Sequence, residues 1–400
     1  MLKKSTFFDF LNRRSDVDFS RFMADSVEDK HYINWNGFLL PMDYGDAEAE
    51  YVSIRNSCAM FDVSPIRKIR IRGAGAGAFL DRLLTRPVSS LPSMRATYTV
   101  FCNADGSLKD DSILYKYADD DYLLMPSDVD HSPYFESLRQ RFELGDITFT
   151  ECTDAWAGVA MQGPYAAAVL QNMGFDNIAS LKPFEVRDYA MAGGTIRLAR
   201  VGFTADLGFE CWFEPGLVDE FLQRVESVRA ATDMTLPGYG LSALQACRLE
   251  GGFVVAGWDF STELEPQPGF ERSPFDIGLG WLVNLNAQDF IGRDALLEQQ
   301  DKGHPFALRS FQIDERNPPQ DGAELYLSDS DDAASVGTIN CSSWSWGMNR
   351  TIGNASIKSE HSELEKAWLT AAGKRITVKL SRGPLIKLER RNQVPASTRL

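Results

Sequence analysis

Two adjacent carboxylates, Asp110 and Asp111, follow a polar turn and open a run of period-two residues. The turn, residues 103–109 (NADGSLK), carries the Asn, Asp and Gly that tight turns favour, and residues 112–117 (SILYKY) follow at once. This pattern predicts a β-hairpin that delivers both carboxylates to the start of a strand. Because neighbouring strand residues point to opposite faces, we expect one carboxylate to face inward and the other to face solvent.

An inward carboxylate is costly to bury unless it has a partner or takes part in chemistry. The alternative for this stretch is a solvated turn whose aspartates only cap the backbone and keep the surface polar. The local sequence leaves both interpretations open.

A second stretch with chemical potential is the segment 202–210 (GFTADLGFE), in which glycines bracket a turn. Glu210 ends the segment and opens the apolar run 211–213 (CWF). A glutamate beside Phe and Trp is either exposed by strand alternation or held for a ligand, and alternation alone favours exposure.

A third stretch, residues 248–252 (RLEGG), ends a predicted helix with the glycines that helix C-termini favour. Arg248 near that end is either a cation favoured by the helix dipole or a side chain that reaches an anionic or carbonyl-rich ligand. Tyr98 and Gln162 are further polar residues embedded in glycine-punctuated apolar sequence.

Composition excludes several classes of function. A chain of 400 residues suits two or three domains, and its net charge of −15 argues against general binding to nucleic acid or to anionic membranes. The six cysteines and four histidines are scattered without metal-ligand spacing, so we expect reduced thiols and no metal site. No signal peptide and no run of about twenty apolar residues is present, which favours a cytoplasmic protein.

The elements that must position these residues alternate between short strands and helices. A strand at 67–72, a glycine-rich turn and a helix from 79 invite a dinucleotide-binding interpretation, but Ala78 replaces the third glycine, so a tight strand-to-helix connection is favoured. We expect the other elements at these positions: helices at 132–142, 165–173, 217–235 and 241–250, a loop at 258–280, and strands at 307–313, 334–340 and 375–380. We expect the last dozen residues to form a frayed tail.

The order of the motifs resembles the tetrahydrofolate-dependent family of the glycine-cleavage T-protein (aminomethyltransferase). That family also contains folate-dependent demethylases and the folate domains of sarcosine and dimethylglycine oxidases. Each landmark is weak alone, but seven occur in the family order: 60–64 (MFDVS), 103–111, 161–164 (MQGP), 202–210, 248–252, 278–281 (GLGW) and 290–296 (FIGRDAL).

The resemblance implies an α+β fold in which three domains form a cloverleaf around a central folate channel, with a β-barrel as the C-terminal domain. It implies an N-terminal segment at 1–50 packed on the folate-binding domains and two α+β folate-binding lobes at 51–300. The barrel is expected at 301–385 and a tail at 386–400.

The resemblance also implies residue roles. Asp111 matches the family's catalytic aspartate, with Asp110 as its outward-facing neighbour, and Tyr98 matches a tyrosine near the reacting carbon. A carboxylate beside N5 of tetrahydrofolate can position that nitrogen and stabilise positive charge that develops during transfer. A general-base role requires that burial raise the pKa of Asp111.

Four further positions are implied to bind the folate. Glu210 matches the glutamate that holds the pterin ring, and a carboxylate that accepts two pterin N–H groups forms a well-matched charge-assisted pair. Arg248 is implied to line the same site, together with Phe203, which stands where the family has a tyrosine, and Gln162.

Departures from the T-protein pattern concern the one-carbon donor. They include Pro65-Ile66 in place of His-Met, Pro126 in place of an asparagine, Ala256 in place of a tyrosine, a longer loop at 262–275 and the sequence 340–344 (NCSSW). We therefore expect a methyltransferase (demethylase) that moves a one-carbon group from a small O-, S- or N-methylated donor to N5 of tetrahydrofolate. The alternatives are an aminomethyltransferase that acts on a lipoyl carrier protein and a non-catalytic folate-binding regulatory protein.

Overall fold

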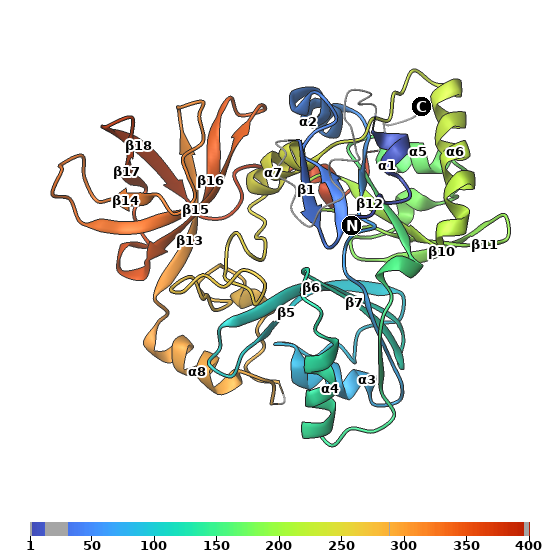
Figure 1. Cartoon of the computed structure of the whole chain (residues 1–400), viewed down its shortest axis with the longest axis horizontal. Coiled ribbons are helices and arrows are strands. Elements are labelled where there is room, and N and C mark those ends of the chain that lie inside the picture. The colour runs from blue at the N-terminus through green and yellow to red at the C-terminus, as the bar shows by residue number, and fades with distance from the viewer. Residues whose placement is uncertain (1, 13–30, 288, 396–399) are drawn as a thin grey trace.

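The computed structural model describes residues 2–12, 31–287, 289–395 and 400, and these residues form three lobes (Figure 1). Helices and strands are mixed in two of the lobes and the third is a β-barrel, so the α+β prediction is confirmed. In the described part of the chain, no helix combines the length and apolar character needed to cross a membrane.

The first lobe is built on an antiparallel sheet whose strand order is β10-β11-β12-β9-β3. One face of this sheet packs against the helices α1, α5 and α6, and the other face contacts α2, α7 and the second lobe. The bounds are α1 (Phe8–Leu11), β1 (Tyr32–Trp35), β2 (Phe38–Pro41), α2 (Ala47–Asn56), β3 (Ala59–Asp62), β9 (Ala157–Gln162), α5 (Ala166–Asn172), β10 (Val186–Met191), β11 (Gly194–Ala199), β12 (Gly208–Phe213), α6 (Val218–Ala231) and α7 (Leu241–Glu250).

The second lobe is a sheet with the order β5-β6-β7-β4-β8, covered on one face by α3 and α4. The predicted hairpin is confirmed, because residues 103–107 connect β5 to β6. Strand β4 pairs antiparallel with both its neighbours, so the glycine-rich turn after it belongs to no parallel dinucleotide-binding unit. The bounds are β4 (Ile69–Arg72), α3 (Ala76–Leu83), β5 (Arg95–Cys102), β6 (Leu108–Ala118), β7 (Asp121–Pro126), α4 (Ser132–Arg141) and β8 (Thr148–Glu151).

The third lobe is a closed six-stranded barrel with its own apolar core, which confirms the predicted C-terminal barrel. A long connection between α7 and α8 precedes it and packs on β5 and β6. The bounds are α8 (Arg293–Lys302), β13 (Phe306–Ile313), β14 (Glu324–Tyr326), β15 (Ser335–Ser345), β16 (Arg350–Lys358), β17 (Lys366–Ala371) and β18 (Lys374–Ser381). Short 3₁₀ turns lie at η2 (Thr153–Ala155), η3 (Ile178–Ser180), η4 (Pro215–Leu217), η5 (Gly280–Leu282), η6 (Ser359–His361) and η7 (Glu389–Arg391).

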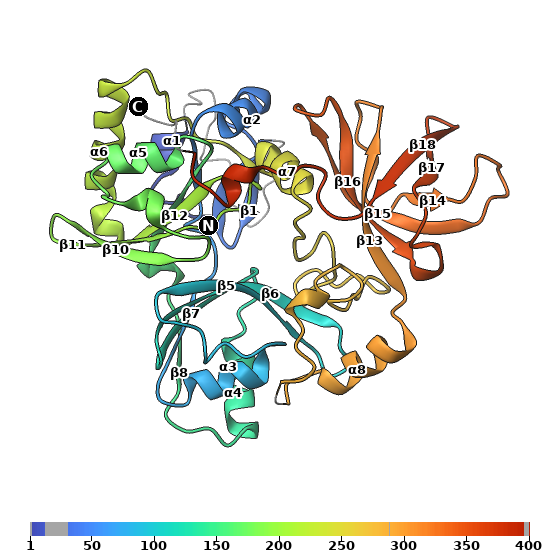
Figure 2. The ribbon, with the colours of Figure 1, turned by 180° about the vertical axis from the view of Figure 1, so that it is seen from behind.

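The segment that follows the barrel corrects one prediction. The sequence predicts a frayed tail, but residues 384–395 leave β18 and return to the first lobe, where η7 lies near α2 and α7 (Figure 2). Residues 396–399 lie outside the described residues. The segment is ordered because the contacts that hold it come from residues far away in the sequence, which local patterns do not indicate.

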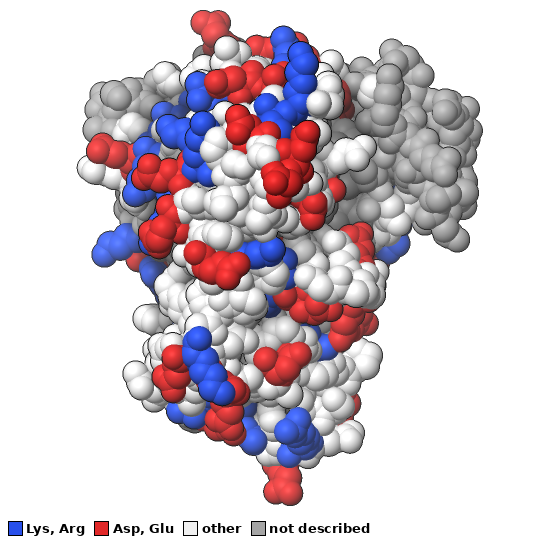
Figure 3. Space-filling model, turned by 90° about the vertical axis from the view of Figure 1, so that its left-hand side faces the viewer, with Lys and Arg blue, Asp and Glu red and all other residues white. Residues whose placement is uncertain are grey.

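Charged side chains are interspersed on the molecular face shown in Figure 3, where acidic and basic groups alternate over the described surface. With a net charge of −15, this face offers no extended basic area of the kind that binds a phosphate backbone.

Candidate active site

The hairpin between β5 and β6 brings Tyr98 and Asp111 together. Their backbones lie on adjacent strands, with Val100 opposite Asp111 and Tyr98 opposite Ile113, so both side chains project from the same face of the sheet. The Tyr98 hydroxyl donates a hydrogen bond of 2.7 Å to Oδ2 of Asp111. Both side chains are partly exposed, and the Trp281 ring lies 6.4 Å from the Tyr98 ring, centroid to centroid.

The surroundings of Asp111 raise the pKa of its carboxyl group toward neutral pH. Burial, followed by the negative charge of Asp110, raises the pKa of Asp111 to about 7, against the lowering effect of the hydrogen bond from Tyr98. Burial and the nearby Asp111 hold the pKa of Tyr98 well above its usual range, so the phenol remains a donor. A carboxyl group with this pKa can accept or release a proton near neutral pH.

The structure contradicts the expected orientation of Asp110. Its side chain is 0% exposed, because the face of β6 opposite to Asp111 packs against α3 and α4. Its oxygens accept hydrogen bonds from the backbone N–H of Asp111 at 2.8 Å and from Ser127 Oγ at 2.7 Å, and His131 Nε2 lies 2.8 Å away. The prediction that Asp110 faces outward was wrong, since tertiary packing covers both faces of the strand.

His131 and Ser127 were missed by the sequence interpretation. His131 lies immediately before α4 and is buried, with its ring stacked on Phe135. Its Nδ1 atom has no hydrogen-bond partner among the described residues. A lone histidine ahead of a predicted helix carries no signal for such a role, because its partner lies twenty-one positions away in the sequence.

Glu210 lies on β12, at the surface where the first lobe meets the second. Its Oε2 atom accepts hydrogen bonds from Tyr115 of β6 at 2.9 Å and from Trp212 Nε1 at 3.2 Å. Burial raises the pKa of Glu210, while these two donors and the charge of Lys68 oppose that rise. Both hydrogen bonds reach Oε2, which leaves Oε1 without a partner among the described residues.

Lys68 is the buried cation beside this carboxylate. Its ammonium group donates to the backbone oxygens of Ser64 and Ile66 at 2.9 and 2.7 Å and lies 4.8 Å from the centre of the Trp212 ring. Burial lowers the pKa of Lys68 to about 8. The lysine therefore supplies positive potential near Glu210, while its ammonium group donates two hydrogen bonds within the protein.

One face of β6 connects the two carboxylates. Asp111, Ile113 and Tyr115 occupy alternate positions on it, so the Cα atoms of Asp111 and Tyr115 lie about 13 Å apart at the usual strand rise. Tyr115 reaches Glu210 across the junction between the lobes. The fold therefore brings Tyr98, Asp111 and Glu210 onto one surface between the first and second lobes.

Phe203 belongs to the turn that precedes β12, and Gln162 is the last residue of β9. The Phe203 ring is 38% exposed and stacks on Phe253 at 5.2 Å. Gln162 is fully buried beneath the turn, where its Oε1 atom accepts a hydrogen bond of 2.8 Å from Thr204. Its position is that of a residue that supports the turn, and the predicted cofactor contact of Gln162 stays a prediction.

Arg248 lies where α7 meets the barrel and is 1% exposed. Its guanidinium pairs with Asp259 at 2.9 Å and also donates to Gln245, to the backbone oxygen of Phe253 and to Cys341 Sγ. Asp259, which the sequence interpretation missed, contributes to the raised pKa of Asp111 and so lies within electrostatic reach of it. Every nitrogen of Arg248 is thus bound within the protein.

Comparison with known proteins agrees with this fold. The family profile described as "GCVT N-terminal domain" matches residues 28–287. An aminomethyltransferase of Lysinibacillus sphaericus is 28% identical over 89% of this chain and 94% of its own length, and one of Geobacillus kaustophilus is 30% identical over 82% and 86%. The crystal structure of the glycine cleavage system aminomethyltransferase T from Bartonella henselae superposes with a TM-score of 0.79 at 20% identity, covering 98% of this chain and 99% of that one.

The profile spans more than half of the chain, and the structural match shows the same fold over nearly its whole length. These matches confirm the resemblance that the seven sequence landmarks indicated. The chain belongs to the glycine-cleavage T-protein family and is a one-carbon transferase.

Proposed function

We propose that this protein transfers the methylene carbon of a carrier-bound aminomethyl group to tetrahydrofolate at the junction of the first two lobes, with release of ammonia and of the carrier thiol. One observation carries the proposal. The Tyr98–Asp111 pair and Glu210 lie on one surface, and among the described residues only Oε2 of the Glu210 carboxylate is hydrogen-bonded. The relatives named above are aminomethyltransferases, which favours this donor over the methylated small molecule expected from the sequence.

In this proposal Glu210 binds the pterin edge. Tyr115 and Trp212 orient the carboxylate through Oε2, so Oε1 is available to accept an N–H group of the ring. Such charge-assisted bonds are short and directional, and they are stronger where water is excluded. The residues present therefore fit a folate, and Phe203 supplies an apolar surface at the neighbouring turn.

Asp111 acts at the reacting end. Tetrahydrofolate supplies N5 as the atom that accepts the one-carbon unit. Asp111 as a carboxylate stabilises positive charge near that atom, and its pKa of about 7 also lets it hold a proton during the reaction. Tyr98 fixes Oδ2 through its hydrogen bond and leaves Oδ1 to face the reactants.

Methyl transfer from a small donor is the second candidate, and the loop 262–275 is the observation that favours it. The ammonium group of Lys109 pairs with Glu263, and the Leu108 N–H donates to the Arg272 backbone oxygen at 2.7 Å. These contacts fasten the loop to the hairpin that bears Asp111. A loop fastened there suits a small free donor better than a donor carried on a protein arm.

The two candidates are separated by the oxidation state of the folate product. The protein is incubated with tetrahydrofolate and either an aminomethylated lipoyl carrier protein or a panel of methylated small molecules. Methylene-tetrahydrofolate that forms only with the carrier supports the aminomethyl proposal, and 5-methyl-tetrahydrofolate from a free donor supports the second candidate.

The Asp111→Asn variant is the control for both reactions. Loss of an electrostatic contributor at the reacting centre is expected to slow turnover by about 10²–10³-fold. Folate binding without turnover by the wild-type protein for any donor would instead favour the non-catalytic alternative.

A further inference from the structure

The segment that follows the barrel is tied to the first lobe at its beginning. We call residues 384–395 the tail strap. The backbone N–H groups of Leu385 and Ile386 both donate to the backbone oxygen of Glu250, at 2.9 and 3.0 Å, and so bind the C-terminal end of α7. The Leu385 side chain joins an apolar cluster with Leu249 and Cys341. The tail strap is therefore an ordered part of the interface between barrel and first lobe.

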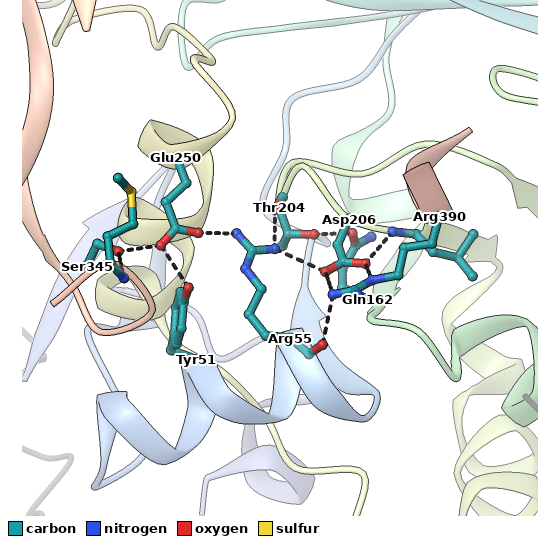
Figure 4. A network of polar contacts seen from close by, with 10 residues as sticks. Tyr51, Arg55, Gln162, Thr204, Asp206, Glu250, Ser345 and Arg390 are labelled. Carbon is teal, nitrogen blue, oxygen red and sulfur yellow. Dashed lines mark hydrogen bonds and ion pairs between the residues drawn. The ribbon is translucent and has the colours of Figure 1, made fainter. Parts of the chain in front are cut away.

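Arg390 is the polar anchor of the tail strap. Its guanidinium forms a two-pronged ion pair with Asp206, with Nε 2.6 Å from Oδ1 and Nη2 2.8 Å from Oδ2 (Figure 4). Nη2 also donates to the backbone oxygen of Arg55 at 2.9 Å. Paired, planar hydrogen bonds of this kind are among the strongest that charged side chains form. The contact joins residues that are 184 positions apart.

Asp206 belongs to a buried network in which two carboxylates face two guanidinium groups. Arg55 donates to Asp206 at 3.2 Å, to the Thr204 backbone oxygen at 2.7 Å and to Glu250 at 2.6 Å (Figure 4). Tyr51 and Ser345 complete the hydrogen bonds of Glu250. Removing Arg390 leaves two buried carboxylates on one guanidinium, and an uncompensated buried charge is strongly destabilising.

The partner of Arg390 lies in the turn that leads to the proposed folate site. Residues 200–207 connect β11 to β12, and Glu210 is the third residue of β12. The tail strap also contacts the other side of this turn, because the Arg391 guanidinium lies 4.7 Å from the centre of the Phe253 ring, on which Phe203 stacks. Arg200, at the start of the turn, donates to the Arg391 backbone oxygen at 3.1 Å.

We infer that the tail strap orders the turn at 200–207 and that Arg390 is a positioning residue for folate binding. The inference rests on the proposed function for its consequence, although the ordering of the turn is independent of it. Arg390 acts through Asp206 and touches none of the proposed reacting groups. Because Asp111 and Tyr98 lie in the second lobe, loss of Arg390 is expected to raise KM for tetrahydrofolate while kcat is preserved.

The test compares the Arg390→Met, Arg390→Lys and Arg382→Met variants. Arg382 pairs with Glu363 at the barrel surface, so its variant removes an arginine–glutamate contact that does not involve the turn. Hydrogen exchange of amides 200–208 is measured in the free protein, and KM and kcat for tetrahydrofolate are measured with the donor that supports turnover. Arg390→Met is expected to accelerate exchange and to raise KM, each by about tenfold, as for a lost hydrogen bond between charged groups.

Arg390→Lys is expected to give an intermediate effect, since lysine keeps the charge but cannot form the two-pronged pair. It also decides the matter if the methionine variant does not fold. Arg382→Met is expected to match the wild type. Unchanged exchange in both Arg390 variants would overturn the ordering of the turn, and faster exchange with unchanged KM would overturn the positioning of folate. Failure of wild-type protein to bind tetrahydrofolate would reject the proposed function, while the exchange data would still decide whether Arg390 orders the turn.

Discussion

At the scale of single residues, the pair Asp110–Asp111 divides its tasks between the two faces of one strand. Asp110 is buried against α4 and forms no part of the surface between the lobes, while Asp111 lies on that surface with Tyr98. The two are nevertheless coupled, because the charge of Asp110 contributes to the raised pKa of Asp111. The charge of Asp110 therefore adds to the effect of burial on the pKa of Asp111.

Replacing Asp110 with asparagine is expected to shift the pH dependence of the reaction. The change removes a negative charge that disfavours ionisation of Asp111, so the pKa of Asp111 falls from about 7 and the acidic limb of kcat/KM moves to lower pH. Burial remains the larger cause, so the pKa stays above the usual value of an aspartate. A pH–rate profile from pH 5 to 9 measures the shift.

Ser127→Ala is the matched control for that experiment. It removes the 2.7 Å hydrogen bond to Asp110 but leaves the charge in place. The acidic limb is therefore expected to move much less than in the asparagine variant. Equal shifts in the two variants would argue that disturbance of the hairpin, and not charge, controls Asp111.

Glu210→Gln tests the residue proposed to bind the pterin edge. Glutamine keeps an acceptor of similar size but loses the charge, so tetrahydrofolate binding is expected to weaken by about 1–3 kcal/mol, the scale of a hydrogen bond to a charged group. Calorimetric titration measures the change in affinity, with Glu214→Gln, at an exposed position beyond β12, as the control. An affinity equal to that of the wild type would remove Glu210 from the folate site.

At the scale of elements, α7 is the helix at which the first lobe, the long connection and the barrel make contact. Arg248 near its C-terminal end pairs with Asp259 of the long connection and contacts Cys341 of the barrel, while Glu250 holds Arg55 of α2. These partners come from three separate segments of the chain. The helix therefore carries the polar links that hold the barrel against the first lobe.

Arg248→Met is expected to destabilise this junction by about 3–5 kcal/mol, because it leaves the carboxylate of Asp259 buried without its cation. Chemical denaturation followed by circular dichroism measures the loss, and Arg248→Lys, which keeps the charge, should lose less. The same variants decide between the two interpretations of Arg248. A protein of normal stability that no longer binds tetrahydrofolate would show that Arg248 contacts the ligand and that its structural contacts are secondary.

The elements also show what the sequence could predict. Local patterns were sufficient for the β5–β6 hairpin, for α4 and α7 and for the barrel strands β13, β15 and β18, because turn residues, helix stops and alternation act over a few positions. The orientation of Asp110 depends on α4, which covers the face of β6 opposite to Asp111. The ordered conformation of the tail strap depends on its contact with Asp206. Neither partner is near in sequence, so local propensity had no means to indicate them.

At the scale of the whole molecule, the site exists only because two lobes share one apolar core. Residues of both sheets pack together there, with Phe61, Ala160 and Trp212 from the first lobe and Tyr115 and Leu123 from the second. The barrel has a separate core. Docking of the first two lobes is thus the event that sets the distance between Glu210 and Asp111.

Two neighbouring leucines of β7 allow this docking to be tested. Leu123 faces the core that the first two lobes share, and Leu124 faces the core formed by the second lobe alone. Both side chains are buried. Replacing either with alanine removes the same atoms, so each is expected to cost about 2–5 kcal/mol of stability. Because only Leu123 packs at the junction, Leu123→Ala is expected to raise KM for tetrahydrofolate, while Leu124→Ala leaves it unchanged at a temperature at which both variants are folded.

Thermal unfolding establishes that temperature, and steady-state kinetics below it measures KM for each variant. A rise in KM confined to Leu123→Ala would mean that the geometry of the site depends on how the lobes dock, since the two variants differ only in which face of the strand loses its packing. Equal KM values would place the pterin-binding geometry within the first lobe alone. In that case the hydrogen bond from Tyr115 to Glu210 would join the lobes without controlling the affinity for folate.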